Sequence, residues 1–123
     1  MAKQNIQKVE KPWGHELIWA QTKDYVGKIL HVKKGQRLSL QYHQVKEETM
    51  YVASGKMILV FEDAAGELEE ITMNAGEAHH IPTGRKHRVV AIEDTDIFEV
   101  STPHLNDVVR IEDTYGREGT SKA

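Results

Sequence analysis

Cysteine is absent from the 123-residue sequence, and so is any long apolar run. Without cysteine the chain has no disulfide, no thiolate metal ligand and no cysteine nucleophile, so a bound metal must be held by nitrogen and oxygen donors. The stretch with the fewest charges, residues 57–61, is far shorter than a membrane span of about 20 residues. The first dozen residues have no apolar core of signal-peptide length, and we expect a soluble, cytoplasmic protein that does not contact membranes.

The charge balance gives no sign of a nucleic-acid surface. Lysine and arginine number 16 against 19 acidic residues, for a formal net charge of -3, and no basic stripe is interleaved with aromatic residues. The length suits one hydrophobic core and is too short for two. We therefore expect a single domain over residues 1–123, with its core at about 11–117 and a frayed C-terminal tail at 118–123.

Short runs in which apolar and polar residues alternate dominate the sequence, at 15–20, 25–32, 36–42, 48–54, 56–62, 67–72, 87–93 and 96–101. Such runs, separated by turn segments such as 54–56 and 74–76, predict strands. No segment holds a convincing helical apolar stripe. An all-β chain of many short strands must hide its edges, and a double-sheet jelly roll or barrel is the usual solution.

One of these strands carries potential ligands on a single face. Between residues 37 and 43, Leu38, Leu40 and Tyr42 alternate with polar residues. Gln41 and His43 therefore point to the same side, about 7 Å apart along the strand. They line either the inside of a small barrel or the solvent-facing side of an edge strand.

Two spacing motifs extend this set of ligands. The first reads Gly35-x5-Gln41-x-His43-x4-Glu48-x6-Gly55, and the second reads Gly76-x5-Pro82-x-Gly84-x2-His87. They resemble the two sequence motifs of the cupin superfamily. The resemblance implies a double-stranded β-helix, or jelly-roll barrel, in which one metal ion is held by four residues, Gln41, His43, Glu48 and His87. Gln41 departs from the family pattern, where a histidine is usual, and so does Ala91, where the second motif often closes with Asn.

The chemistry of these four groups limits the choice of metal. Two imidazoles, one carboxylate and one amide oxygen suit a divalent ion that acts as a Lewis acid. We expect one such ion, zinc in the first place, with manganese, iron or nickel as alternatives. Gln41 suits redox iron less well than an imidazole would. The remaining alternative is a vestigial site that has lost its metal.

Segments along most of the chain narrow the resemblance, notably residues 11–14, 28–32, 35–43, 81–88 and 108–117. They resemble the phosphomannose isomerase domain, and more closely the single-cupin form at the C-terminal end of bifunctional mannose-1-phosphate guanylyltransferases. The resemblance implies a zinc-type isomerase that interconverts mannose 6-phosphate and fructose 6-phosphate. After His43, residues 44–50 lack the further histidines and the tryptophan that the family commonly has, so the identity of the sugar stays open.

An isomerase of this kind needs a proton-transfer group and a cationic phosphate site. Lys28 matches a family position and is our candidate for the catalytic base or for a phosphate partner; the alternative is a solvated strand lysine. Arg110 and Arg117, in the family-like C-terminal motif, are our candidates for phosphate binding, with surface salt bridges as the alternative. We prefer these two arginines to three other basic residues, Arg37, Arg85 and Lys86.

Three functions remain open from the sequence. The first is the isomerase acting on a small sugar phosphate, and the second is a non-catalytic metal- and carbohydrate-binding cupin. The third, which Gln41 disfavours, is a metal-dependent oxygenase. Because one small barrel has exposed strand edges, we also expect a homodimer formed through edge strands or the N-terminal strap.

Overall fold

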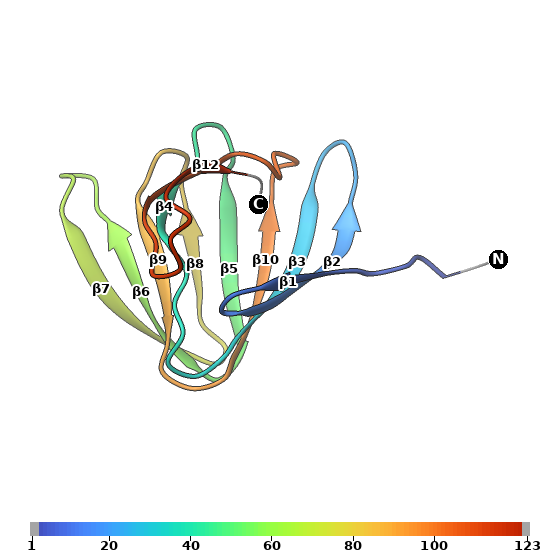
Figure 1. The fold of residues 1–123 in the computed structure, drawn as a ribbon, viewed down its shortest axis with the longest axis horizontal. Coiled ribbons are helices and arrows are strands. Elements are labelled where there is room, and N and C mark those ends of the chain that lie inside the picture. Colours follow the sequence, from blue (N-terminus) through green and yellow to red (C-terminus); the bar gives the residue numbers. More distant parts are fainter. Residues whose placement is uncertain (1–2, 122–123) are drawn as a thin grey trace.

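The computed structural model describes residues 3–121, which fold into two six-stranded antiparallel sheets (Figure 1). Sheet A contains, in spatial order, β1 (Gln7–Lys11), β2 (Gly14–Gln21), β3 (Val26–Val32), β10 (Thr95–Ser101), β5 (Glu48–Ser54) and β8 (Ala78–Ile81). Sheet B contains, in the same sense, β12 (Gly119–Ser121), β11 (Val108–Glu112), β4 (Leu40–Tyr42), β9 (His87–Ala91), β6 (Lys56–Glu62) and β7 (Leu68–Asn74). The all-β prediction is confirmed. Within residues 3–121 no helix is long and apolar enough to cross a membrane.

Each of the eight expected strands overlaps an observed one, and four further strands have weak local signals. β1 is polar, β8 has four residues and β12 has three, while β11 lies in a segment that we assigned to a sequence motif. The tail expected to fray from residue 118 instead pairs with β11 over residues 119–121. Backbone hydrogen bonds to an open strand edge do not depend on apolar side chains, which explains this difference. Residues 122–123 lie outside the described part.

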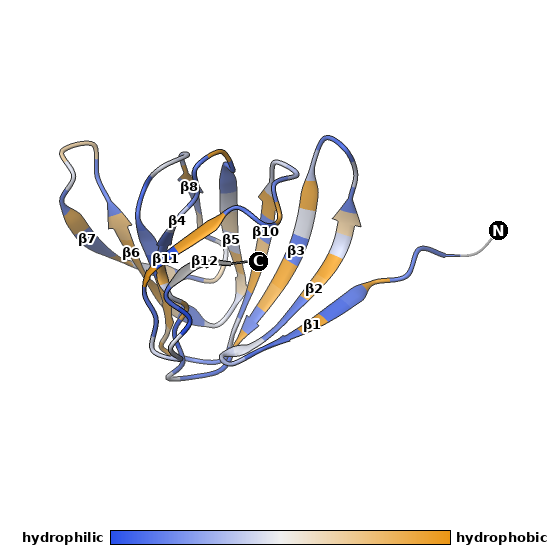
Figure 2. Ribbon diagram, turned by 45° about the horizontal axis from the view of Figure 1, so that its top comes forward, coloured by the Kyte–Doolittle hydropathy of each residue, from blue (hydrophilic) through white to orange (hydrophobic). Residues whose placement is uncertain are grey.

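The hydrophobic core lies between the inner faces of the two sheets. Along β10, buried and exposed residues alternate from Thr95 to Ser101, as expected for a strand with one face inside. The core includes Trp13, Leu30, Leu59 and Ile97, each at most 3% exposed. Each such side chain stabilises the fold by about 1.5–3 kcal/mol. Figure 2 shows the corresponding mixture of hydrophobic and hydrophilic residues along the strands.

A row of polar side chains crosses the inner face of sheet B beside this core. Arg110 on β11 lies opposite Gln41 on β4, and Gln41 lies opposite His87 on β9. Directly opposite residues of an antiparallel ladder point to the same face, and both Arg110 and His87 are buried. The register of three strands therefore brings these groups together although they are far apart in the sequence.

Sheet A presents a second row across the interior. Lys28 on β3 lies opposite Glu99 on β10, which in turn lies opposite Met50 on β5. All three are buried. The interior thus has an apolar part and an adjoining part whose walls carry ionisable groups.

Gly14, at the start of β2, lies directly against the backbone of β3. Its φ is 152°, and a Cβ there would lie 1.9 Å from the carbonyl oxygen of His31. We expect Gly14→Ala to lower the free energy of unfolding by more than about 3 kcal/mol, because the backbone of β2 or β3 must move to relieve the clash. Urea denaturation followed by circular dichroism measures the free energy of unfolding. Gly66→Ala is the control: φ is 84° and the space around it is open, so we expect a loss of only about 1–2 kcal/mol. Equal losses would contradict the prediction.

Candidate metal centre and its cavity

Three buried side chains converge between the sheets. The imidazoles of His43 and His87 and the carboxylate of Glu48 each offer one atom within 4.8 Å of the others. Nε2 of His43 and Nε2 of His87 both lie 3.0 Å from the same oxygen, Oε1 of Glu48. Each of the three residues is at most 3% exposed, so bulk water does not solvate the charge of the carboxylate.

The outer nitrogens of both rings are already occupied. Nδ1 of His43 donates to the carbonyl of Asp107, and Nδ1 of His87 donates to the carbonyl of Arg85 at 2.9 Å. A neutral imidazole with its proton on Nδ1 presents a lone pair at Nε2. Nε2 of His87 has no hydrogen bond within the described structure. Two nitrogen lone pairs and a carboxylate oxygen therefore face one another, which is the arrangement that a divalent transition-metal ion would satisfy.

Asp107 fixes the loop that separates the first two of these ligands. Its carboxylate accepts hydrogen bonds from the backbone N–H groups of Gln44, Val45 and Lys46 at 3.0, 2.7 and 2.8 Å. Partial burial acts to raise the pKa of Asp107, but these three N–H groups outweigh it and lower the pKa. The same residue thus closes the turn after His43 with its side chain and orients the His43 ring with its carbonyl.

Gln41 lies next to the three converging groups. It stands directly opposite His87 in the ladder and lines the same cavity as His43. Its Oε1 accepts a hydrogen bond from the Ser39 hydroxyl at 2.7 Å and keeps a second lone pair. Its role as a fourth ligand stays a prediction.

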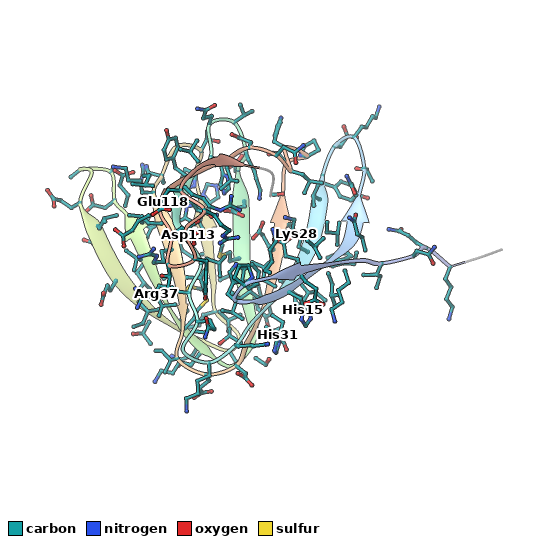
Figure 3. All side chains as sticks on the ribbon, viewed as in Figure 1. His15, Lys28, His31, Arg37, Asp113 and Glu118 are labelled. Atoms are coloured by element: carbon teal, nitrogen blue, oxygen red, sulfur yellow. The ribbon has the colours of Figure 1, made fainter. Side chains whose placement is uncertain are left out.

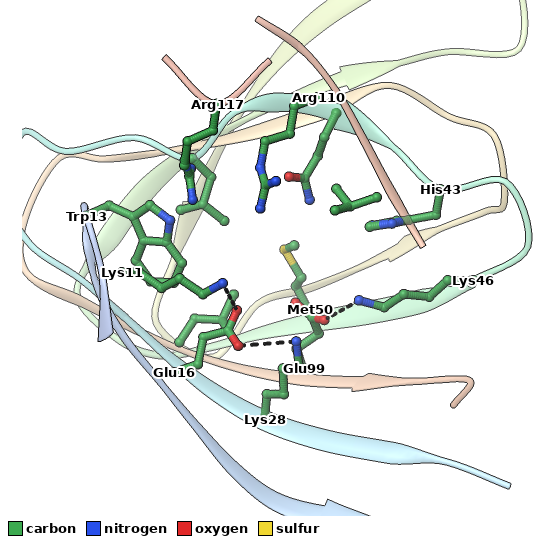
Figure 4. A pocket seen from close by; sticks show the side chains of 14 residues that line it. Lys11, Trp13, Glu16, Lys28, His43, Lys46, Met50, Glu99, Arg110 and Arg117 are labelled. Atoms are coloured by element: carbon green, nitrogen blue, oxygen red, sulfur yellow. Dashed lines mark hydrogen bonds and ion pairs between the residues drawn. The ribbon is translucent and has the colours of Figure 1, made fainter. Parts of the chain in front are cut away.

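The metal centre adjoins a cavity that is unusually rich in charge (Figure 4). Arg110 and Arg117 point into it from one side and Lys11, Lys28 and Lys46 from the other. The complete lining is Lys11, Trp13, Glu16, Lys28, Leu30, Leu38, Gln41, His43, Lys46, Met50, Glu99, Val108, Arg110 and Arg117. Five basic groups against two carboxylates make this wall attractive to an anion.

The three lysines are held by the two carboxylates of the cavity wall. Nζ of Lys46 lies 3.2 Å from Glu99 and also 3.5 Å from Glu48. Glu16 lies 3.3 Å from Nζ of Lys28 and 3.9 Å from Nζ of Lys11. These lysines are therefore ion-paired inside the protein and are not the solvated strand residues of the alternative interpretation.

Burial and mutual charge shift the acidity of this network. Burial would lower the pKa of Lys46, but Glu99 and Glu48 outweigh it and raise the pKa. Burial would raise the pKa of Glu48, but the nearby Lys46 ammonium outweighs it and the pKa lies well below its usual range. Burial and the neighbouring Glu48 raise the pKa of Glu99 to about 7. The network around Lys46 therefore contains one carboxylate that stays ionised, Glu48, and one that exchanges its proton near neutral pH, Glu99.

The two arginines differ in how they are paired. Nε of Arg117 donates to Asp113 at 2.8 Å, and Nη2 donates to the other oxygen at 3.2 Å. Arg110 is 7% exposed, its Nε has no hydrogen bond, and it forms no ion pair among residues 3–121. Burial and the nearby Arg117 lower the pKa of Arg110. Arg110 is thus a buried cation whose charge is left for a ligand to balance.

All the site residues expected from the sequence lie at this one place, but several neighbours escaped the sequence analysis. Lys11, Glu16, Lys46 and Glu99 were not among the expected site residues. Glu99 shares the inward face of β10 with Ile97, yet the outward positions of that strand are equally apolar, so alternation did not identify the face. Lys46 lies in the loop between β4 and β5, where the alternation of a strand does not apply and the sequence does not indicate where its side chain points.

The sequence of the chain matches that of a known protein family. The sequence profile described as mannose-6-phosphate isomerase C-terminal matches residues 1–113. The chain belongs to this family. The xanthan biosynthesis protein XanB of Xanthomonas campestris pv. campestris is 33% identical over 116 residues, and the alginate biosynthesis protein AlgA of Pseudomonas aeruginosa is 30% identical over 119 residues. These alignments cover 90% and 93% of this chain but 24% of each relative, so the chain spans about a quarter of their length.

Solved structures show the same fold. KdgF from Halomonas sp. matches with a TM-score of 0.70 at 23% identity, over 81% of this chain and 88% of that one. Oxalate decarboxylase from Bacillus subtilis matches with a TM-score of 0.75 at 15% identity, over 87% of this chain and 30% of that one. Both are cupins, and the predicted cupin fold is confirmed.

We expect the purified protein to hold one equivalent of a divalent transition metal, and His87→Ala to reduce its metal content to background. The substitution removes one of three buried donors and leaves a carboxylate without its partner. Elemental analysis after dialysis measures the content. His80→Ala is the control, since His80 is exposed and paired with Glu47 at 2.6 Å, so metal content should not change. A site that holds only magnesium would contradict this prediction.

Asp107→Asn should destabilise the protein in a pH-dependent way. Because the folded pKa of Asp107 is lowered, its contribution is present above the unfolded value of about 3.9 and is lost as the pH falls through the folded value. At neutral pH we expect a loss of about 1–3 kcal/mol, since an amide NH2 would face two N–H donors. The difference from the parent should shrink towards pH 3 in urea titrations. Asp24→Asn, in the turn between β2 and β3, is the control: no hydrogen bond to its carboxylate is present among residues 3–121, so the free energy of unfolding at neutral pH should stay unchanged.

Proposed function

We propose that this protein is a metal-dependent sugar-phosphate isomerase that converts mannose 6-phosphate to fructose 6-phosphate. The observation that carries the proposal is one cavity in which the converging His43, Glu48 and His87 adjoin an unpaired buried cation, Arg110. Membership in the mannose-6-phosphate isomerase C-terminal family supports it. The curated relatives are about four times as long, so their activities reach this chain only as a proposal.

The reaction moves a proton between C1 and C2 of the sugar while the carbonyl and hydroxyl exchange places. We assign metal binding to His43, Glu48 and His87, with Gln41 as the fourth ligand, and propose zinc, with manganese, iron or nickel as alternatives. When bound, such an ion supplies Lewis-acid polarisation of the carbonyl oxygen. The carbonyls of Asp107 and Arg85 keep the two imidazoles in the orientation that this requires.

The phosphate end of the substrate fits the arginine side of the cavity. Arg110 offers a guanidinium that forms no ion pair within the described part of the chain, and a guanidinium can form two parallel hydrogen bonds to a phosphate. Arg117 is held in place by Asp113 and adds a second positive charge at a fixed position. We therefore propose that Arg110 forms the main phosphate contact and that Arg117 supports it.

We assign the proton transfer to groups on the wall of the cavity opposite the two arginines. Lys28 was our sequence candidate for the base, but it is ion-paired with Glu16 at 3.3 Å. A lysine held in this way is better suited to stabilise negative charge on the substrate oxygens than to accept a proton. Glu99, directly opposite Lys28 in the ladder, and Glu16 are then the carboxylates available as proton acceptors.

A binding module without catalysis is the second candidate. Residues 44–50 lack the further histidines and the tryptophan that the family commonly has, and the lysines of the cavity wall are engaged in ion pairs with its carboxylates. A protein of this kind would bind metal and carbohydrate without converting the carbohydrate.

A metal-dependent oxygenase fits less well, because Gln41 stands where an imidazole is usual. For an isomerase we propose the cytoplasm as location, since a charged sugar phosphate does not cross membranes unaided.

The central experiment measures fructose 6-phosphate formation from mannose 6-phosphate by the parent protein and two variants. His87→Ala should abolish turnover. Arg110→Ala should raise KM about 10- to 100-fold, because losing one charge-assisted phosphate contact costs about 1.5–3 kcal/mol. Its kcat should change much less, since the contact is remote from the reacting carbons.

Arg85→Ala is the matched control for the loss of an arginine. Arg85 does not line the cavity and donates to the carbonyl of Glu62 at 3.3 Å, so KM should stay unchanged. Equal effects of Arg110→Ala on mannose and on mannose 6-phosphate would contradict the phosphate assignment. Binding of metal and sugar phosphate without any conversion would replace the isomerase with the binding module.

A further inference from the structure

A row of polar side chains crosses the outer face of sheet A at the end where β2 begins. Glu10 on β1 lies opposite His15 on β2, which lies opposite His31 on β3. His31 in turn lies opposite Asp96 on β10, and Asp96 lies opposite Ser54 on β5. Residues directly opposite one another in an antiparallel ladder share a face. The register of five strands therefore places two imidazoles between two carboxylates on the outside of the barrel.

The contacts within this row hold His31 in the orientation of a metal ligand. Nδ1 of His31 donates to Oδ1 of Asp96 at 2.7 Å, and the other oxygen of Asp96 accepts a hydrogen bond from the Ser54 hydroxyl at 3.1 Å. A neutral imidazole with its proton on Nδ1 presents a lone pair at Nε2. A histidine that binds a metal usually donates its other ring N–H to a carboxylate or a carbonyl in this way.

The ring of His15 lies against the ring of His31. Their centroids are 5.1 Å apart and their planes differ by 21°, and Figure 3 shows the two side chains close together. The Cβ atoms of directly opposite residues are about 4.5–5.5 Å apart, and a zinc-type ion holds each histidine nitrogen at about 2.0–2.1 Å. A rotation of the His15 side chain therefore brings one of its nitrogens within reach of an ion bound at Nε2 of His31.

The row is open to solvent and has an excess of negative charge. The side chain of His31 is 30% exposed and that of Asp96 is 42% exposed, so an ion reaches the imidazoles without any opening of the barrel. Glu10 forms an ion pair with Lys8 at 3.3 Å, with both side chains more than half exposed. Such a surface pair contributes only about 0–1 kcal/mol. Glu10 can therefore leave Lys8 and turn towards a cation beside His15.

We propose that His15 and His31, with Glu10 as the third ligand, bind a second divalent transition-metal ion on the outer face of sheet A. Asp96 orients His31 from the other side, and water fills the remaining coordination positions. Two imidazoles select copper, nickel or zinc over magnesium and calcium. The site shares no ligand with the buried metal centre, and the proposal does not depend on the proposed function.

An ion in this position holds β1 against β2 and β3. β1 is an edge strand whose side chains are mostly exposed, so burial of apolar surface contributes little to its attachment. Glu10 and His15 are followed directly by Lys11 and Glu16, which line the cavity and form an ion pair at 3.9 Å. Successive side chains of a strand point to opposite faces. A metal bridge on the outer face therefore fixes the strands that carry this ion pair on the inner face.

Isothermal titration of the metal-loaded parent protein with Ni²⁺ tests the site, and one further equivalent should bind. Asp96→Ala should weaken this binding about 10- to 100-fold, the usual effect of losing the group that orients a ligand. His15→Ala and His31→Ala should weaken it at least as much. His104→Ala is the control, since His104 is exposed and its Nδ1 contacts the Thr102 hydroxyl at 2.9 Å. Equal binding by all four variants would show an adventitious ion only and would overturn the proposal.

Titration of His87→Ala separates the outer site from the buried metal centre. This variant lacks a ligand of the buried centre and should still bind one equivalent of Ni²⁺. His31→Ala in the same background should remove that equivalent. If the parent protein binds one equivalent and His87→Ala binds none, the ion belongs to the buried centre and the proposal is wrong. Both readouts are independent of any enzymatic activity.

Hydrogen exchange measured by mass spectrometry tests whether the ion holds β1. With Ni²⁺ at ten times its dissociation constant, the amides of residues 7–11 should exchange about 10-fold more slowly in the parent protein. His31→Ala and Glu10→Gln should abolish this effect. The amides of β7, an edge strand of sheet B, are the control and should exchange at an unchanged rate. Slowing that persists in Glu10→Gln would contradict the assignment of Glu10, and unchanged exchange in the parent protein would overturn the proposed bridge.

Discussion

Glu48 is a carboxylate with almost no access to water, and the arrangement around the metal centre follows from the need to neutralise it. Burying an unpaired carboxylate costs several kcal/mol, so its surroundings must supply positive charge. Lys46 supplies one ammonium at 3.5 Å, and the two imidazoles present nitrogen atoms at 3.0 Å from the same oxygen. Because both rings have committed their outer nitrogens to backbone carbonyls, their inner nitrogens face the carboxylate, and a cation among the three groups would satisfy all of them.

Most charged groups of the cavity wall are likewise paired with a group of opposite charge. Each carboxylate of its wall holds at least one lysine, and Asp113 holds Arg117, which leaves Arg110 as the basic group without an ion pair among residues 3–121. Pairing fixes long side chains that would otherwise be mobile, so a ligand meets a surface already in place. Cupin barrels with other names and low sequence identity share the fold. The chemistry must therefore be argued from these residues and not from the barrel.

The sequence predicted those parts of the structure that depend on local spacing. Alternation located the strands that face the core, and the motif between Gly35 and Gly55 picked out His43 and Glu48, which lie just after β4 and at the start of β5 in opposite sheets. It did not indicate that Lys46 turns inward between them, because the direction of that side chain depends on Glu99, which is distant in sequence. Likewise nothing near Asp107 indicated that its carboxylate would close the turn at residues 44–46. These contacts arise only when the chain has folded.

The pairing of β4 also affects the order in which parts of the site form during folding. This three-residue strand joins β9 through Gln41 and His87 and joins β11 through Gln41 and Arg110, and both partners are synthesised long after it. Pairing between distant segments is slow, since the loop between them must close first. His43 gains its orienting carbonyl from Asp107, which lies 64 residues further along the chain. The ring of His43 is therefore oriented only after the long segment between the two residues has closed.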